Sequence, residues 1–87
     1  MGEIVNLEAA HKHSFGNRDE VMASSRCGCF YCLKVYSPAE IFDWIDEFNP
    51  AGCTAQCPRC GIDSVIGDAS GIAIGEDFLR KMNQHFF

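Results

Sequence analysis

The chain has 87 residues, six of them cysteine, and its formal net charge is −5. A chain of this length buries only about two-thirds of the surface that its unfolded form exposes, so we expect one domain over residues 1–87 that needs a stabilising element besides its core. The acidic balance and the seven scattered basic residues disfavour nucleic acid as a partner, because clustered Lys and Arg dominate phosphate binding.

The beginning of the chain carries no visible export signal. Residues 1–6 contain no basic segment followed by an apolar run, so the six cysteines are expected in a reducing cytoplasm rather than in three disulfides. The apolar runs are far shorter than the roughly 18 residues that cross a bilayer. These features predict a cytoplasmic protein without a membrane span.

A short helix is predicted near the N-terminus. Residues 1–14, with Ile4 and Val5 among them, fit neither a strand nor a helix clearly. The segment Asn17-Arg-Asp-Glu20 then fits a capping box, in which the first side chain caps the helix and the last reaches back. This predicts a helix over Arg18–Ser24, with Phe15 packed beneath it.

A longer helix is predicted over Ser37–Phe48. It begins with an N-cap serine, a proline at the first helical position and a glutamate three residues after the cap. Apolar residues then recur at helical spacing until Asn49-Pro50, and acidic residues are expected on the solvated face. The apolar residues are Ile41, Trp44, Ile45 and Phe48, and the acidic ones are Glu40, Asp43, Asp46 and Glu47.

The sequence of the last third of the chain indicates a hairpin followed by a terminal helix. Ser64–Gly67 and Ile72–Ile74 resemble two short strands, and the turn-forming residues between them suit a hairpin. Glu76–Phe87 has acidic residues in its first turn and apolar residues at helical spacing, which predicts a helix that docks on the body. The expected packing between ribbon and helices uses Trp44, Ile45, Phe78 and Met82.

The most specific pattern is a pair of Cys-x-x-Cys motifs separated by 24 residues. Each motif can form a tight turn that directs two sulfurs at one point, and two such turns complete a tetrahedral Zn²⁺ site. Gly61 suits the positive φ that follows such a turn, whereas Leu33 stands at the same place in the first motif, which is expected to be less regular. We therefore predict one structural zinc ion bound by Cys29, Cys32, Cys57 and Cys60.

Other uses of these residues stay open. Cys57-Pro-Arg-Cys60 resembles a redox dithiol, but such a motif should begin a helix, and the following residues are not helical. Cys27 can replace Cys29 as a ligand only through a looser turn, and Cys53 is expected to be a partly buried residue near the metal. None of the three histidines stands at metal-ligand spacing from a cysteine; these are His11, His13 and His85.

Three functions are compatible with a closed zinc site. Because four thiolates leave no position for a substrate, a non-enzymatic protein-interaction module is the leading hypothesis. One alternative is a nucleic-acid-binding zinc ribbon. Another is an enzyme that uses the loop from Asp63 to Asp68. The residues that would contact phosphates in the first alternative are Arg26, Lys34 and Arg59.

Four segments carry a further pattern: His13-Ser-Phe-Gly-Asn-Arg18, Cys27-Gly-Cys-Phe-Tyr-Cys32, Ser37-Pro-Ala-Glu40 and Cys57-Pro-Arg-Cys-Gly-Ile-Asp-Ser-Val-Ile-Gly-Asp68. Together they resemble a family of small bacterial proteins that are labelled only as cytoplasmic proteins. The resemblance implies a bacterial, zinc-ribbon-like protein and offers no catalytic residue to carry over. Cys53 and the Ala51-Gly52 insertion depart from the family pattern, which argues against Cys53 as a ligand.

The expected structure is therefore an α+β fold, with a small zinc-ribbon-like β-hairpin core and two or three packed helices. The zinc is expected to stabilise the fold, and the expected partner is another protein. The residues predict neither the identity of that partner nor the oligomeric state.

Overall fold

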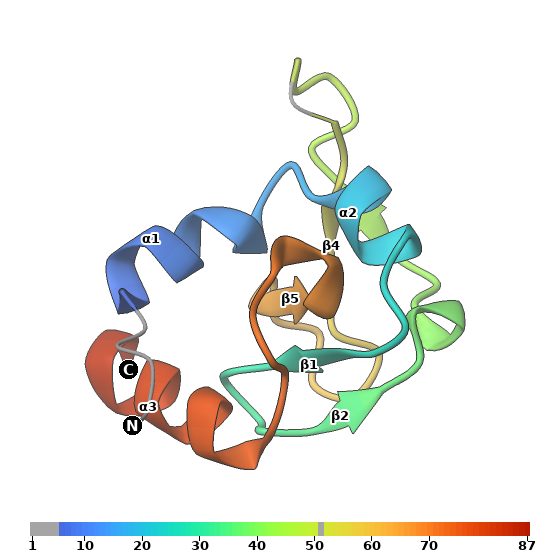
Figure 1. Ribbon diagram of the computed structural model, residues 1–87. Helices are drawn as coiled ribbons and strands as arrows, with labels where there is room; N and C mark the ends of the chain where they lie inside the picture. Colours follow the sequence, from blue (N-terminus) through green and yellow to red (C-terminus); the bar gives the residue numbers. More distant parts are fainter. Residues whose placement is uncertain (1–5, 51) are drawn as a thin grey trace.

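The protein has an α+β fold, as the sequence predicts (Figure 1). The computed structural model describes residues 6–50 and 52–87. Within them, three α-helices accompany a three-stranded and a two-stranded antiparallel sheet. The helices are α1 (Leu7–His11), α2 (Arg18–Met22) and α3 (Glu76–Phe86).

The three-stranded sheet carries both cysteine motifs. Its central strand β1 (Cys27–Cys29) pairs with β2 (Val35–Tyr36) on one side and with β5 (Val65–Gly67) on the other. The first Cys-x-x-Cys motif forms the turn between β1 and β2, and the second one precedes β5. In this register Cys29 lies opposite Val65, so the sheet brings the two motifs side by side although they are far apart in the sequence.

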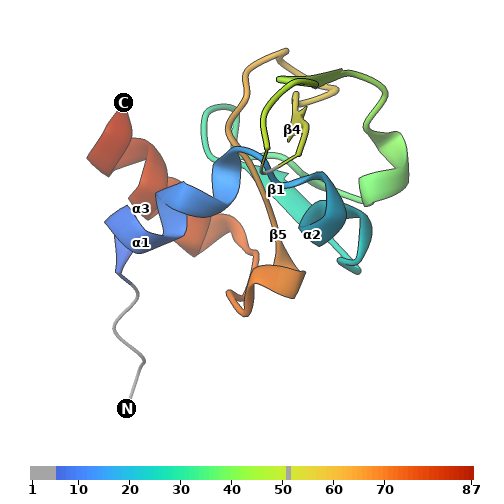
Figure 2. The same cartoon turned by 90° about the horizontal axis from the view of Figure 1, so that it is seen from above.

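The two faces of this sheet bury different residues. Side chains alternate between faces along a strand, so Val65 joins the core around the cysteines while Ile66 joins the core under α1 and α3. Figure 2 shows these two helices together at one end of the molecule, with α2 at the other. The predicted core residues Phe78 and Met82 are buried on α3, and Trp44 packs on the cysteine side.

The predicted helix over Ser37–Phe48 is wrong. The Ser37 hydroxyl accepts a hydrogen bond from the Ala39 N–H at 3.2 Å, but only one 3₁₀ turn, η2 (Pro38–Glu40), follows. The chain then forms β3 (Trp44–Ile45), which pairs with β4 (Thr54–Ala55). Phe48, which the helical pattern places on the buried face, is 92% exposed near the tip of this hairpin.

The hairpin forms in place of the helix because its tertiary contacts outweigh the local helical preference. A lone helix of about 12 residues is marginal in water, so its formation depends on tertiary contacts. β4 leads directly into the second cysteine motif, and pairing with β3 satisfies its main chain. Asp46 has a positive φ of 62° at the start of the turn and accepts a hydrogen bond from the Thr54 hydroxyl at 2.8 Å.

The helix at Arg18 is confirmed, but its predicted cap is wrong. Asn17 makes no side-chain cap, and its amide instead hydrogen-bonds to Val65 of the three-stranded sheet and to Ala55 of the two-stranded sheet. Glu20 bonds to His13 at 2.8 Å rather than reaching back along the helix. Phe15 is 49% exposed and is therefore not packed beneath the helix as expected.

The first described residues form elements that the sequence did not predict. Asn6 caps α1 by accepting a hydrogen bond from the Ala9 N–H at 3.0 Å, and α1 continues into a 3₁₀ turn, η1 (Lys12–Ser14). Ala10 is buried in the core under α1 and α3. The possible strand residues Ile4 and Val5 lie outside the described residues.

The C-terminal third follows the prediction in part. β5 and α3 are confirmed, and Phe78, Leu79 and Met82 are buried as the helical spacing predicts. The expected hairpin is wrong, because a 3₁₀ turn, η3 (Asp68–Ser70), follows β5 and no strand forms over Ile72–Ile74. β5 pairs with β1 instead.

Gly67 permits close contact between β5 and α2. A Cβ at this position would clash with the Ser24 hydroxyl and lie 3.2 Å from the Val21 Cα. We expect Gly67→Ala to lower the free energy of unfolding by about 1–3 kcal/mol through overpacking, as measured by urea denaturation. Gly75→Ala is the matched control, because no atom lies within 4 Å of a Cβ there. Equal denaturation midpoints for the two variants would contradict this interpretation.

Candidate metal centre

The first cysteine motif forms a tight knuckle at the end of β1. The Leu33 N–H donates to the Cys29 carbonyl at 2.8 Å, and the Tyr31 N–H donates to the Cys29 sulfur at 3.4 Å. Leu33 has a positive φ of 65°, which is uncommon for a residue with a side chain. The local hydrogen bonds therefore hold this turn against a backbone preference.

The second motif repeats this arrangement. The Gly61 N–H donates to the Cys57 carbonyl at 2.9 Å, the Arg59 N–H donates to the Cys57 sulfur at 3.3 Å, and the φ of Gly61 is 81°. The expected use of Gly61 is confirmed. The expected irregularity of the first knuckle is wrong, because Leu33 adopts the conformation that glycine takes in the second.

Gly61 tests how much the positive φ contributes. A Cβ there meets no atom within 4 Å, so Gly61→Ala adds backbone strain without a clash. We expect a loss of about 1–2 kcal/mol in the free energy of unfolding, with metal content retained because Leu33 shows that the knuckle tolerates a side chain. Gly61→Asn should lose less, since asparagine visits this conformation more readily. Urea denaturation measures both, and a larger loss for asparagine would contradict the argument.

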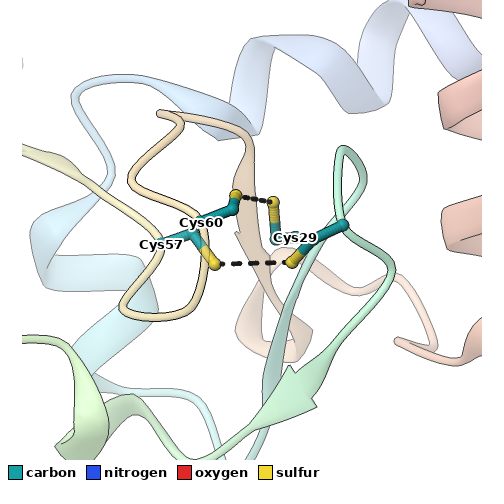
Figure 3. A group of neighbouring side chains, drawn as sticks. Cys29, Cys57 and Cys60 are labelled. Carbon is teal, nitrogen blue, oxygen red and sulfur yellow. Dashed lines mark hydrogen bonds between the residues drawn. The ribbon is translucent and has the colours of Figure 1, made fainter.

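The two knuckles bring four sulfurs together (Figure 3). All four lie within 4.8 Å of one another, and the Cys29–Cys60 and Cys32–Cys57 pairs are each 3.7 Å apart. A disulfide requires about 2.05 Å. Tetrahedral bonds of about 2.3 Å to a central ion place the sulfurs about 3.8 Å apart. The cluster of Cys29, Cys32, Cys57 and Cys60 can therefore bind a metal ion.

Burial opposes ionisation of Cys29 and Cys60, so a neighbouring cation would favour their thiolate forms. Cys29 is fully buried and Cys57 is 3% exposed. Burial raises the pKa of Cys29 far above its ordinary range and also raises the pKa of Cys60. Burial acts on Cys57 in the same direction, but the nearby Tyr36 hydroxyl and the N–H groups of Arg59 and Cys60 lower its pKa to about 7. A divalent ion would offset the charge of the four thiolates.

The buried hydroxyl of Tyr36 independently indicates a negatively charged sulfur at Cys57. Its side chain is buried, and its hydroxyl has no well-aligned hydrogen-bond partner among the described residues. The hydroxyl lies beside Cys57, and burial together with this neighbour raises the pKa of Tyr36, so it stays protonated. A buried, unpaired hydroxyl is costly, and a metal-bound Cys57 thiolate is an acceptor for it.

The two remaining cysteines lie outside the cluster. Cys27 is fully buried, its sulfur donates to the Tyr36 carbonyl at 3.5 Å, and burial raises its pKa to about 12. The structure thus groups Cys29, and not Cys27, with the other three cysteines. Cys53 is half-buried beside β4, and its carbonyl accepts a hydrogen bond from the Arg18 N–H at 3.0 Å. Ala51, from the predicted insertion, lies outside the described residues.

The histidines are engaged elsewhere. His13 bonds to Glu20, the ring of His11 packs on Phe86 with centroids 4.3 Å apart, and His85 lies 4.0 Å from Glu8. None of them joins the four cysteines in the described part of the chain.

Several residues of the two alternative functions have other partners or lie outside the cysteine cluster. Asp68 accepts a hydrogen bond from the Ser25 N–H at 2.9 Å and so stabilises a turn. Asp63 precedes β5 in the chain, whereas Asp68 follows it. Neither belongs to the cysteine cluster. Arg59, a possible phosphate contact, forms an ion pair with Glu40 at 2.7 Å.

Sequence reasoning missed Tyr36 as a component of this centre. Its position after the first knuckle indicated only a strand, and no local pattern shows that its hydroxyl approaches Cys57. That contact depends on the pairing of β1 with β2 and on the return of the chain through β4.

Comparisons add no assignment to this geometry. No family model, curated protein or solved structure matches the chain. The resemblance to bacterial cytoplasmic proteins therefore stays an expectation. Within the described residues, every helix is too short or too polar to cross a membrane.

Proposed function

We propose that the protein binds one Zn²⁺ through Cys29, Cys32, Cys57 and Cys60, and that this ion is structural. The sulfur spacing carries the proposal, since it matches the edges of a tetrahedron filled entirely by protein ligands. A filled tetrahedron has no position for water or substrate. The protein is accordingly proposed to be non-enzymatic, and its thiols fit a reducing cytoplasm.

Metal analysis tests the zinc proposal. Protein purified without chelator should contain one zinc per chain, and Co²⁺ exchanged into the site should give the absorption spectrum of tetrahedral thiolate ligation. Cys57→Ser should abolish stoichiometric binding, whereas Cys53→Ser should retain it. A folded protein without stoichiometric metal would refute the proposal.

We further propose that the protein is an interaction module that binds another protein. Phe42 and Phe48 are 73% and 92% exposed on and beside the β3–β4 hairpin, which projects from the body (Figure 1). Exposed aromatic side chains are typical of interaction surfaces. The segment between Lys34 and Arg59 has four acidic residues and no Lys or Arg. This charge favours a partner with basic residues around an apolar pocket over nucleic acid or an anionic membrane.

Site-specific cross-linking tests this proposal. A photoreactive phenylalanine analogue at position 42 or 48 should form a discrete adduct with one protein in native cells. The same analogue at Gln84, an exposed position on α3, is the matched control and should not form that adduct. Adducts with nucleic acid, or no adduct at positions 42 and 48, would refute the interaction proposal while leaving the zinc site intact.

A further inference from the structure

A second site lies beside the cysteine centre. A pocket of about 240 Å³ opens between the α1–η1 segment, the first knuckle, the residues after the second knuckle and the end of α3. Four phenyl rings line it, together with a single carboxylate, that of Asp63. Within the described residues, no Lys or Arg lines the pocket, but the ring of His11 does. The rings belong to Phe15, Phe30, Phe86 and Phe87.

Two of the phenyl rings pack at a tilt against Phe30, and the His11 ring packs on Phe86 with centroids 4.3 Å apart. Phe30 is almost fully buried, and its ring centre lies 6.1 Å from that of Phe86 and 5.8 Å from that of Phe87. The interplanar angles are 48° and 42°, so neighbouring rings are tilted. Phe15 and Phe87 are 49% and 60% exposed, which leaves aromatic surface accessible at the rim.

The charge around the pocket is negative. Asp63 is exposed and makes no hydrogen bond or ion pair within the described part of the chain. It follows Cys60, a ligand of the proposed zinc centre, by three residues, and four thiolates that bind one Zn²⁺ carry a net charge of about −2. The faces of aromatic rings are also electronegative and attract cations.

We propose that this pocket binds an organic cation, namely an alkylammonium or guanidinium group. Aromatic rings together with a carboxylate recognise such groups through cation–π attraction and charge. The group can be a lysine, methylated lysine or arginine side chain of a partner, or a free quaternary ammonium compound. The inference deepens the proposed interaction function, and it rests on the zinc centre only for part of the charge.

Titration of the zinc-loaded, ¹⁵N-labelled protein tests the site. The probes are choline and its neutral isostere 3,3-dimethylbutan-1-ol, which differ in charge but hardly in shape. Choline should shift the amide signals of residues around the pocket and bind about three- to tenfold more tightly than the alcohol. Equal binding of the two compounds, or no shifts near the pocket, would overturn the proposal.

Peptide probes then distinguish the two sources. Short glycine-rich peptides that display lysine, trimethyllysine or arginine should bind more tightly than choline if a partner supplies the cation. Choline binding without peptide binding assigns a free quaternary ammonium compound. Both results support a cation site.

Matched variants locate the binding. Phe87→Leu keeps apolar area but removes the ring, and Asp63→Asn removes the charge, so each should weaken choline binding about three- to tenfold. Met22→Leu and Asp77→Asn alter an exposed apolar side chain and an exposed acid elsewhere and should leave it unchanged. If the control variants weaken choline binding as much as the two pocket variants, the assignment of binding to this pocket is overturned. Zinc content measured in each sample separates failure of this pocket from failure of the proposed zinc site.

Discussion

Removal of the metal is expected to unfold the protein. Structural zinc contributes roughly 10–16 kcal/mol of apparent binding free energy in small modules, which exceeds the net stability of about 5–15 kcal/mol of a typical domain. The strands here have two or three residues, and α1 and α2 have five each. Elements of this length are not stable on their own.

The position of the sulfurs explains why this loss is global. The centre joins the turn between β1 and β2 to the segment between β4 and β5. It therefore links β1 to the chain that leads into β5, its neighbour in the three-stranded sheet. Without the ion, burial opposes ionisation of Cys29 and Cys60, and the sulfurs lose their common partner. The core on the cysteine side would then lack its central contacts.

Circular dichroism and amide NMR dispersion measure the effect. Chelation should abolish both signatures of the fold, and stoichiometric Zn²⁺ should restore them. The spectra of Cys57→Ser should resemble those of the chelated protein. Cys53 is half-buried and lies outside the cluster, so the spectra of Cys53→Ser should resemble those of the unsubstituted protein. A chelated protein with native amide dispersion would show that zinc does not stabilise the fold. Affinity should fall as the pH falls, because protons compete for the thiolates.

The local patterns of the sequence predicted those parts of the fold that depend on a few neighbouring residues. The cysteine spacing predicted the cluster, and Gly61 predicted the turn of the second knuckle. The 11-residue helix α3 was predictable because Phe78, Leu79 and Met82 follow its period and are buried together.

The Ser37–Phe48 segment shows why the rest was not predictable. Its apolar residues repeat at helical spacing, yet Trp44 and Ile45 pair with Thr54 and Ala55 in the hairpin that leads to the second knuckle. The pairing with Thr54 and Ala55 depends on residues outside the Ser37–Phe48 segment, so the pattern within that segment cannot predict it. The same limit applies to Tyr36, whose neighbour Cys57 is 21 positions away in the chain.

Asn17→Ala is expected to be among the most destabilising substitutions away from the sulfurs. The Asn17 side chain is 3% exposed, donates to the carbonyls of His13 and Val65 at 2.8 Å each, and accepts from the Ala55 N–H at 3.1 Å. Val65 and Ala55 are fully buried, so water cannot replace the lost partner. Each unpaired buried group costs about 1–3 kcal/mol, which predicts a total loss of about 3–5 kcal/mol.

Urea denaturation of the zinc-saturated protein measures this loss. Asn17→Asp should be no better than alanine, because a carboxylate cannot donate to the two carbonyls that the amide serves. Asn83→Ala is the matched control: the Asn83 amide makes one exposed hydrogen bond to the Tyr31 carbonyl at 3.1 Å, so a loss below about 1 kcal/mol is expected. Similar losses for alanine at positions 17 and 83 would contradict the role of Asn17.

The same substitution should weaken zinc binding although Asn17 touches no sulfur. It ties β4 to β5, the two strands on either side of the second knuckle. If folding and metal binding are one process, a loss of stability in the loaded state appears as a loss of affinity. Because about 1.4 kcal/mol corresponds to a factor of ten, Asn17→Ala should lower the apparent zinc affinity by about two to four powers of ten. Competition with a chelator measures this, and an unchanged affinity would mean that the sheet and the metal centre fold independently.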